Sequence, residues 1–90
     1  MRAPSIVFTE HARWEMVRRG LSEVVVRKVI RHAEQIIPIR AGREIRQSRV
    51  YFKGDGKDYL VRAIVDIMGN RLTVVTVYRT SKIEKYWRQP

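Results

Sequence analysis

The feature that most constrains the fold is a hairpin near the end of the chain, because its loop fixes a strand register. Residues 59–78 form two apolar, β-branched runs separated by Gly69-Asn70, a two-residue loop typical of tight hairpins. Closing this loop predicts that Met68 pairs with Arg71. Since side chains alternate along a strand, the closing pair also predicts which side chains share a face.

This register separates an apolar face from a cationic one. Ile64 is expected opposite Val75, and two residues further along Arg62 is expected opposite Val77. The apolar face is predicted to carry Val61, Ala63, Val65, Ile67, Leu72, Val74, Thr76 and Tyr78. Arg62 and Arg79 are predicted to lie together on the other face, because neither can reach the core without a bulge.

A preceding strand, residues 44–52, extends the cationic face. If Lys53 pairs with Asp58 across the glycine-containing loop, this strand adds Gln47, Arg49 and Tyr51 to that face. Arg49 is then expected directly opposite Arg62. Like charges that face each other across strands are unfavourable unless an anion lies between them. The register therefore indicates a phosphate-binding surface.

The predicted row of Arg49, Arg62 and Arg79 could act in phosphoryl chemistry, because fixed cationic donors stabilise the charge that develops on a pentavalent phosphorus. The alternative interpretation is a row of ordinary solvent-facing arginines, one of them neutralised by Asp66. If the row exists, replacing Arg62 with Leu relieves repulsion. This replacement is expected to leave stability unchanged or to raise it.

The charge of the chain supports a polyanionic partner. Its 14 Arg and 5 Lys outnumber 9 acidic residues, for a formal net charge of +10. Such an excess is typical of nucleic-acid binding, although a generally basic, solubilising surface is the alternative. The chain contains no cysteine, so neither a disulfide nor a thiolate metal site is expected. No apolar run reaches membrane-spanning length and no signal peptide is evident, which predicts a cytoplasmic protein that does not contact membranes.

Two helices are predicted before the sheet. Thr9 can cap a helix from Glu10 to about Arg19, ended by Gly20, and Ser22 can cap a second helix through about residue 34. The first helix is expected to bury Ala12, Met16 and Val17. The second is expected to bury Val25, Val26, Val29, Ile30 and Ala33. A loop of about two residues joins them, which indicates a helix hairpin.

The predicted fold is a single α+β domain over residues 1–90. The helix hairpin packs on one face of a three- to four-stranded antiparallel sheet, and a short C-terminal helix follows. Residues 5–8 are a possible edge strand. Thr80 or Ser81 is expected to cap the last helical turn, which runs through Trp87. With both long helices on the apolar face, the arginine face is expected to be open to solvent.

Two further groups of residues are candidates for chemistry. His11, in the first turn of the first helix, could be a neutral general base, although a polar residue bonded to local backbone is the simpler interpretation. His32 is expected at the surface, and the two histidines do not form a metal site. The basic and aromatic C-terminal run contains Lys82, Lys85 and Tyr86. It suits phosphates and unpaired bases, or it could dock the last helix on the core.

The sequence 8–13, Phe-Thr-Glu-His-Ala-Arg, followed by Met16 and by Arg19-Gly20-Leu21-Ser22, resembles a small prokaryotic domain family of uncharacterised function. Gly42-Arg43 and the strand 72–78 fit the same pattern, so the resemblance covers nearly the whole chain. That family is similar to the RelE-like and BrnT-like toxins of toxin–antitoxin pairs. These toxins share two helices followed by an antiparallel sheet.

The resemblance implies a metal-independent endoribonuclease of the mRNA interferase type, which uses no cofactor and in which the ribose 2′-hydroxyl attacks the adjacent phosphate. Carried onto this chain, the positions that match these toxins are Arg49, Arg62 and Arg79 on the sheet and Tyr86 near the end, and His11 matches the histidine of the uncharacterised family. The residues expected to act in cleavage are His11, Arg62, Arg79 and Tyr86. Five further residues are expected to bind the nucleic acid: Gln47, Arg49, Tyr51, Lys82 and Lys85. The expected partners are RNA, free or as ribosome-bound mRNA, and an antitoxin protein.

Two other functions fit the same surface: a non-catalytic RNA-binding module, or a basic subunit that docks an acidic protein. The preferred RNA sequence, the dependence on ribosomes and the oligomeric state are left open by the sequence.

Overall fold

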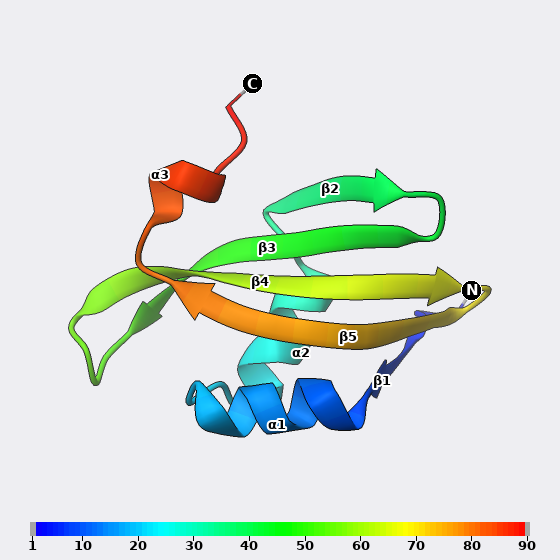
Figure 1. The fold of residues 1–90 in the computed structure, drawn as a ribbon, viewed down its shortest axis with the longest axis horizontal. Coiled ribbons are helices and arrows are strands. Elements are labelled where there is room, and N and C mark those ends of the chain that lie inside the picture. The colour runs from blue at the N-terminus through cyan, green and yellow to red at the C-terminus, as the bar shows by residue number, and fades with distance from the viewer. Residues whose placement is uncertain (1, 90) are drawn as a thin grey trace.

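The computed structural model describes residues 2–89. In this part of the chain a five-stranded sheet lies between two helices on one face and a short helix on the other (Figure 1). The elements are β1 (Ser5–Phe8), α1 (Glu10–Arg18), α2 (Glu23–Arg31), β2 (Gln35–Arg40), β3 (Arg43–Phe52), β4 (Lys57–Met68), β5 (Arg71–Thr80) and α3 (Ile83–Tyr86). The α+β class and the order of helices before the meander are as predicted.

Both long helices begin at the predicted caps. The side chain of Thr9 accepts a hydrogen bond from the Ala12 N–H at 3.0 Å, and Ser22 accepts one from the Val25 N–H at 3.2 Å. Each cap satisfies a backbone donor that the first helical turn leaves without a partner. Gly20 follows α1 with a φ of 65°, the left-handed conformation that ends a helix. α2 ends earlier than expected, because residues 32–34 already lead into β2.

The core lies between these helices and the sheet. It consists of Ile6, Phe8, Ala12, Met16, Leu21, Val26, Val29, Ile30, Val61, Ala63, Val65, Leu72, Val74 and Val77. The expected stripe of α1 is wrong at one position, because Val17 is 83% exposed. Glu15 is buried instead, and its carboxylate forms ion pairs with Arg18 and Arg19 at the end of the helix. Within residues 2–89 no helix is long and apolar enough to cross a membrane.

The sheet has five strands in the order β1-β5-β4-β3-β2, not the three or four predicted. The fifth strand is β1, predicted as a possible edge strand, which lies parallel to β5 with Ile6 opposite Leu72 and Phe8 opposite Val74. The Ile6 and Phe8 side chains enter the core, and β1 forms one edge of the sheet. The remaining neighbours are antiparallel, as expected from the short connections between them.

The register of β4 against β5 was predicted correctly only near the loop. Met68 pairs with Arg71 as expected, but an irregularity between Ile64 and Val65 shifts the strands by one residue. Beyond it Arg62 lies opposite Tyr78 rather than Val77. A one-residue shift exchanges the two faces of a strand. Tyr78 therefore joins the face of Arg62, and Arg79 moves to the helix-bearing face.

The register of β3 against β4 also differs from the prediction. The closing pair is Phe52 with Lys57, not Lys53 with Asp58, so Arg62 lies opposite Gln47. This shift is two residues, an even number, and the predicted faces are kept. Gln47, Arg49 and Tyr51 do share a face with Arg62, but no arginine of β3 lies opposite an arginine of β4. The like-charge pair that indicated a phosphate is therefore absent, and Arg49 faces Leu60 instead.

The face with Arg62 is not open, contrary to expectation. α3 and the residues after it lie near the ends of β2 and β3 (Figure 1), and they contact Gln35, Gln47 and Arg62 on this face. We call residues 83–88 the C-terminal segment. Leu60, which points to the same side as Arg49, is fully buried although it lies outside the main core. The cap of α3 also differs. Lys82 is the N-cap residue and makes no side-chain cap, whereas Thr80 accepts from the Lys82 N–H just before the helix.

Candidate functional site

Four polar side chains form a row across the face that carries the C-terminal segment. Gln35 of β2, Gln47 of β3, Arg62 of β4 and Tyr78 of β5 are brought together by strand pairing, and we call them the polar row. Arg62 Nε donates to Gln47 Oε1 at 2.7 Å, and its Nη1 donates to the Tyr78 hydroxyl at 2.6 Å. Gln47 Nε2 donates to Gln35 Oε1 at 2.8 Å. The row is thus one continuous hydrogen-bonded chain.

The C-terminal segment is attached to this row through its backbone. Gln47 donates to the Tyr86 carbonyl at 3.2 Å. Gln35 exchanges two hydrogen bonds with Arg88, to its carbonyl at 2.7 Å and from its N–H at 3.1 Å. The Tyr86 ring covers Arg62, with its centroid 4.3 Å from the guanidinium carbon, and meets the Tyr78 ring edge-on. Tyr86 is therefore placed over the arginine as well as near a second phenol.

Among residues 2–89, Arg62 differs from most other arginines because it forms no ion pair with a carboxylate. Eight others form ion pairs among residues 2–89: Arg13, Arg18, Arg19, Arg27, Arg43, Arg46, Arg49 and Arg79. None of these pairs involves Arg62, which is only 9% exposed. A buried charge without a counter-ion is unfavourable, and neutral hydrogen bonds and aromatic rings compensate it in part. The arrangement is suited to accept an anion.

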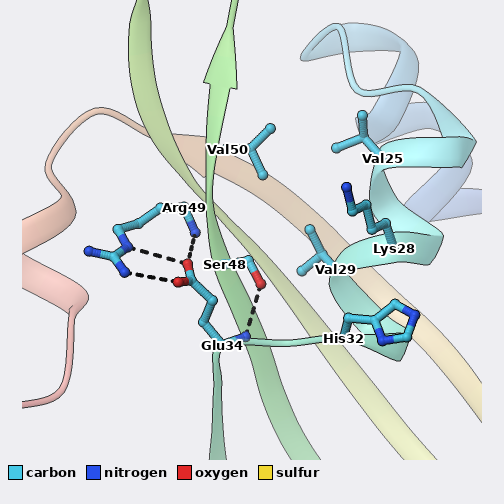
Figure 2. A pocket seen from close by; sticks show the side chains of 8 residues that line it. All are labelled: Val25, Lys28, Val29, His32, Glu34, Ser48, Arg49 and Val50. Carbon is cyan, nitrogen blue, oxygen red and sulfur yellow. Dashed lines mark hydrogen bonds and ion pairs between the residues drawn. The ribbon is translucent and has the colours of Figure 1, made fainter.

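Arg49 is near the polar row but its charge is already neutralised (Figure 2). Its Nη2 and Nε lie 2.8 and 3.3 Å from the two oxygens of Glu34, and its backbone N–H donates to the same carboxylate at 2.7 Å. These hydrogen bonds lower the pKa of Glu34 below its ordinary value. The Trp87 ring stacks on the other side, 4.4 Å from the guanidinium carbon. Arg49 is therefore a structural contact of the C-terminal segment.

Arg79 is excluded from the site, because the shift in β5 turns it to the helix-bearing face. Its guanidinium carbon lies against both the Phe52 and the Tyr59 rings, 4.3 and 4.5 Å from their centroids. Its Nη1 is 3.4 Å from an Asp55 carboxylate oxygen. The predicted cradle of three arginines is therefore wrong. Two of them have carboxylates, and they lie on opposite faces.

The other predicted residues fall into two groups. Tyr51, Lys82 and Lys85 are exposed on β3 and around α3, on the same side of the sheet as the polar row. His11 is exposed on α1, which lies on the opposite side of the sheet from α3 (Figure 1). The structure thus does not bring His11 to Arg62. His32 is exposed as expected.

Sequence reasoning missed two members of the polar row, Tyr78 and Gln35. Tyr78 was assigned to the core because the shift in β5 was not foreseen. For Gln35, the available signal was its position at the start of a strand, in register with Gln47. Among residues 2–89 no group of three or more His, Cys, Asp or Glu side chains is placed to hold a metal ion.

The fold and the site define a small α+β domain with a helix hairpin on one face of its sheet and an uncompensated arginine on the other. The chain belongs to the family described as Domain of unknown function (DUF4258), whose pattern matches residues 8–79. The match includes all four members of the polar row but not the C-terminal segment. No curated protein and no solved structure matches the chain.

Proposed function

We propose that this chain is a metal-independent endoribonuclease related to RelE-like and BrnT-like toxins, with its site at Arg62. One observation carries the proposal: a nearly buried guanidinium, with no carboxylate partner among residues 2–89, is held beside two tyrosines, Tyr78 and Tyr86. The net charge of +10 supports a polyanionic substrate. The helix hairpin followed by an antiparallel meander supports the relationship to those toxins.

In the proposed reaction the 2′-oxygen of the RNA attacks the adjacent phosphorus while its proton passes to water. Arg62 stabilises the additional negative charge on the phosphoryl oxygens. The bond from phosphorus to the 5′-oxygen breaks, and the Tyr86 hydroxyl gives its proton to that oxygen before it regains one from water. The products are a 2′,3′-cyclic phosphate and a free 5′-hydroxyl. Tyr78, which accepts from Arg62, keeps its own proton to donate to the phosphate.

Entry of RNA requires the C-terminal segment to move, because Tyr86 covers Arg62. The segment contacts the polar row through hydrogen bonds to Gln35 and Gln47 and through the Tyr86 ring, which lies against Arg62 and Tyr78. None of the four residues of α3 is buried, so a displacement removes no α3 side chain from the core. We infer that RNA binds as the segment shifts across the face, with Lys82 and Lys85 contacting flanking phosphates.

Non-catalytic RNA binding through the same surface is the second candidate. It is favoured by the positions of Arg79 and His11, which remove two of the four expected catalytic side chains from the site. With one arginine and one proton donor the surface is simpler than the cleavage site that the family resemblance implies. An acidic protein partner on this face is the third candidate.

Cleavage of a single-stranded RNA in EDTA tests the proposal. The parent should cleave it and leave a cyclic phosphate, and a single 2′-deoxy substitution at the cleaved nucleotide should block the reaction. Tyr86→Phe keeps the ring over Arg62 and should lower the cleavage rate by about a hundredfold with little change in RNA affinity. Tyr51→Phe, on the exposed part of β3, is the matched control and should cleave normally.

The outcomes separate the candidates. If Tyr86→Phe cleaves like the parent, Tyr86 is not the proton donor. If the parent binds RNA in a salt-dependent manner but cleaves none of a random-sequence pool, the module is non-catalytic. If it neither binds nor cleaves RNA, the third candidate is favoured.

A further inference from the structure

β3 extends past the end of β2 and leaves part of its edge without a neighbour. β2 begins at Gln35, which pairs with Gln47, whereas β3 continues to Phe52. Among the described residues, no strand pairs with residues 49–52 on the side away from β4. An unpaired edge of this kind presents backbone donors and acceptors to any extended chain beside it.

One backbone donor of this edge, the Arg49 N–H, already binds a group other than a strand, the Glu34 carboxylate. The Arg49 N–H points away from β4 and donates to Glu34 Oε1 at 2.7 Å, where a carbonyl of a neighbouring strand would otherwise lie (Figure 2). Backbone groups of every second residue in a strand point to the same side. The N–H and C=O of Tyr51 therefore point away from β4, as the Arg49 N–H does. The Tyr51 side chain is 62% exposed, which leaves its surroundings accessible.

A groove runs alongside this edge, between α2 and β3 (Figure 2). Its volume is about 350 Å³. Three valines provide its apolar walls: Val25 and Val29 on α2, and Val50 on β3. Lys28 is exposed on α2, and His32 is exposed at the C-cap of this helix. The Ser48 hydroxyl accepts a hydrogen bond from the Glu34 N–H at 3.0 Å. The α2–β3 groove is therefore apolar inside, with a cationic rim.

We propose that the α2–β3 groove binds an extended acidic segment of another protein, which pairs with residues 49–52 as an additional strand. Every second side chain of such a strand points to the α2 side, where aliphatic groups fill the space between Val25, Val29 and Val50. Backbone hydrogen bonds to Tyr51 give affinity without a sequence requirement. This inference does not depend on nuclease activity.

The acidic character of the partner follows from the charges around the groove. Lys28 lines the groove on the α2 side and is exposed. The carboxylate that lines the groove, Glu34, is already engaged by Arg49. A cationic partner would be repelled by the rim and by the net charge of +10. RNA is disfavoured, because the groove offers valines where unpaired bases require aromatic surfaces.

The experiment uses the whole chain and a capped peptide of about six residues, near the usual length of a strand, with valine and glutamate in alternation. Its titration into ¹⁵N-labelled protein should perturb the amides of α2 and residues 49–52 saturably, with a Kd below about 1 mM. Exchange of the Tyr51 amide with solvent should slow down on binding. A peptide with lysine in place of glutamate should bind more weakly.

Substitutions in the α2–β3 groove and outside it test whether the peptide binds there. Val25→Glu should abolish binding, whereas Val24→Glu, at the adjacent and exposed position of α2, should not. Lys28→Glu should weaken binding by about fivefold, the size of an exposed ion pair, and Arg71→Glu at the far end of the sheet should leave it unchanged. Since Lys28 is exposed, its substitution tests the groove even if Val25→Glu fails to fold.

Three results would overturn the proposal. The first is no saturable binding of the alternating peptide. The second is binding that leaves Tyr51 exchange unchanged or is indifferent to Lys28→Glu. The third is perturbation of the same α2 and β3 amides by an oligouridine at lower concentration than by the peptide, which would assign the groove to nucleic acid.

Discussion

At the scale of single residues, Arg62 is held by neutral partners. Its two hydrogen bonds go to Gln47 and Tyr78, and Gln47 is completely buried. An arginine in an array of like charges would be expected to tolerate an apolar replacement. In this structure, replacing Arg62 with an apolar residue instead leaves the side-chain oxygen of Gln47, Oε1, without its donor. The Gln47 amide cannot turn to compensate, because its Nε2 donates to Gln35 and Tyr86.

We therefore expect Arg62→Leu to lower the free energy of unfolding by about 1–3 kcal/mol, the cost of a buried polar group that has lost its hydrogen bond. Urea denaturation followed by circular dichroism measures this change. Arg71→Leu, which removes the same charge from an exposed position, should alter stability by less than about 0.5 kcal/mol. Equal stability of Arg62→Leu and the parent would mean that Arg62 does not support Gln47.

At the scale of elements, local signals were sufficient for the helix starts and the hairpin closure. Thr9 and Ser22 cap the helices as their side chains predict, and Gly69-Asn70 closes β4 on β5 at Met68. These features depend on a few adjacent residues. The shift within β5 does not, because Val75 and Val77 are both β-branched and either could enter the core. Only the packing of Val74 and Val77 beneath the helices decides the face.

The residues of the candidate site were also predicted correctly on β3 and β4 and incorrectly on β5. Arg62, Gln47 and Tyr51 share a face because β3 and β4 are regular and the error in their register was even. Arg79 and Tyr78 exchanged faces because the error in β5 was odd. The cover provided by Tyr86 depends on contacts with Arg62, 24 positions earlier, which no local pattern encodes.

The turn between α1 and α2 provides a test at this scale. Gly20 has a φ of 65°, and a Cβ added there would lie 3.8 Å from an Arg79 nitrogen, an ordinary contact. Gly20→Ala should therefore lower stability by about 1–2 kcal/mol through backbone strain rather than collision. Gly54→Ala is the matched control, because a Cβ at Gly54 meets nothing within 4 Å and its φ is not left-handed.

Thermal denaturation of both alanine variants makes the comparison. Gly54→Ala should be neutral or slightly stabilising, because alanine restricts the unfolded chain. A Gly20→Ala variant as stable as Gly54→Ala would show that the turn relaxes out of the left-handed conformation.

At the scale of the whole molecule, some basic side chains form ion pairs with carboxylates and others do not. Eight arginines form ion pairs among residues 2–89, mostly on the helices and within the sheet. The exposed Lys82, Lys85 and Arg88, in contrast, lie within α3 or next to it in the sequence, and none of these ion pairs includes them. Part of the net positive charge is thus outside these ion pairs in and around α3, whose Tyr86 covers Arg62. A polyanion guided by the overall field would meet this surface without displacing an ion pair.

RNA affinity should depend on salt accordingly. If the surface engages about three or four phosphates of a single strand, the slope of log K against log salt should be roughly −2 to −3. The double variant Lys82→Ala/Lys85→Ala should make the slope shallower by about 1–1.5, because each phosphate contact of a single strand contributes about 0.7. Arg71→Ala, at the opposite end of the sheet, should leave it unchanged. Fluorescence anisotropy of a labelled oligonucleotide gives the binding constants. A slope that responds to Arg71 but not to the two lysines would place the RNA at the other end of the molecule and separate its binding from Arg62.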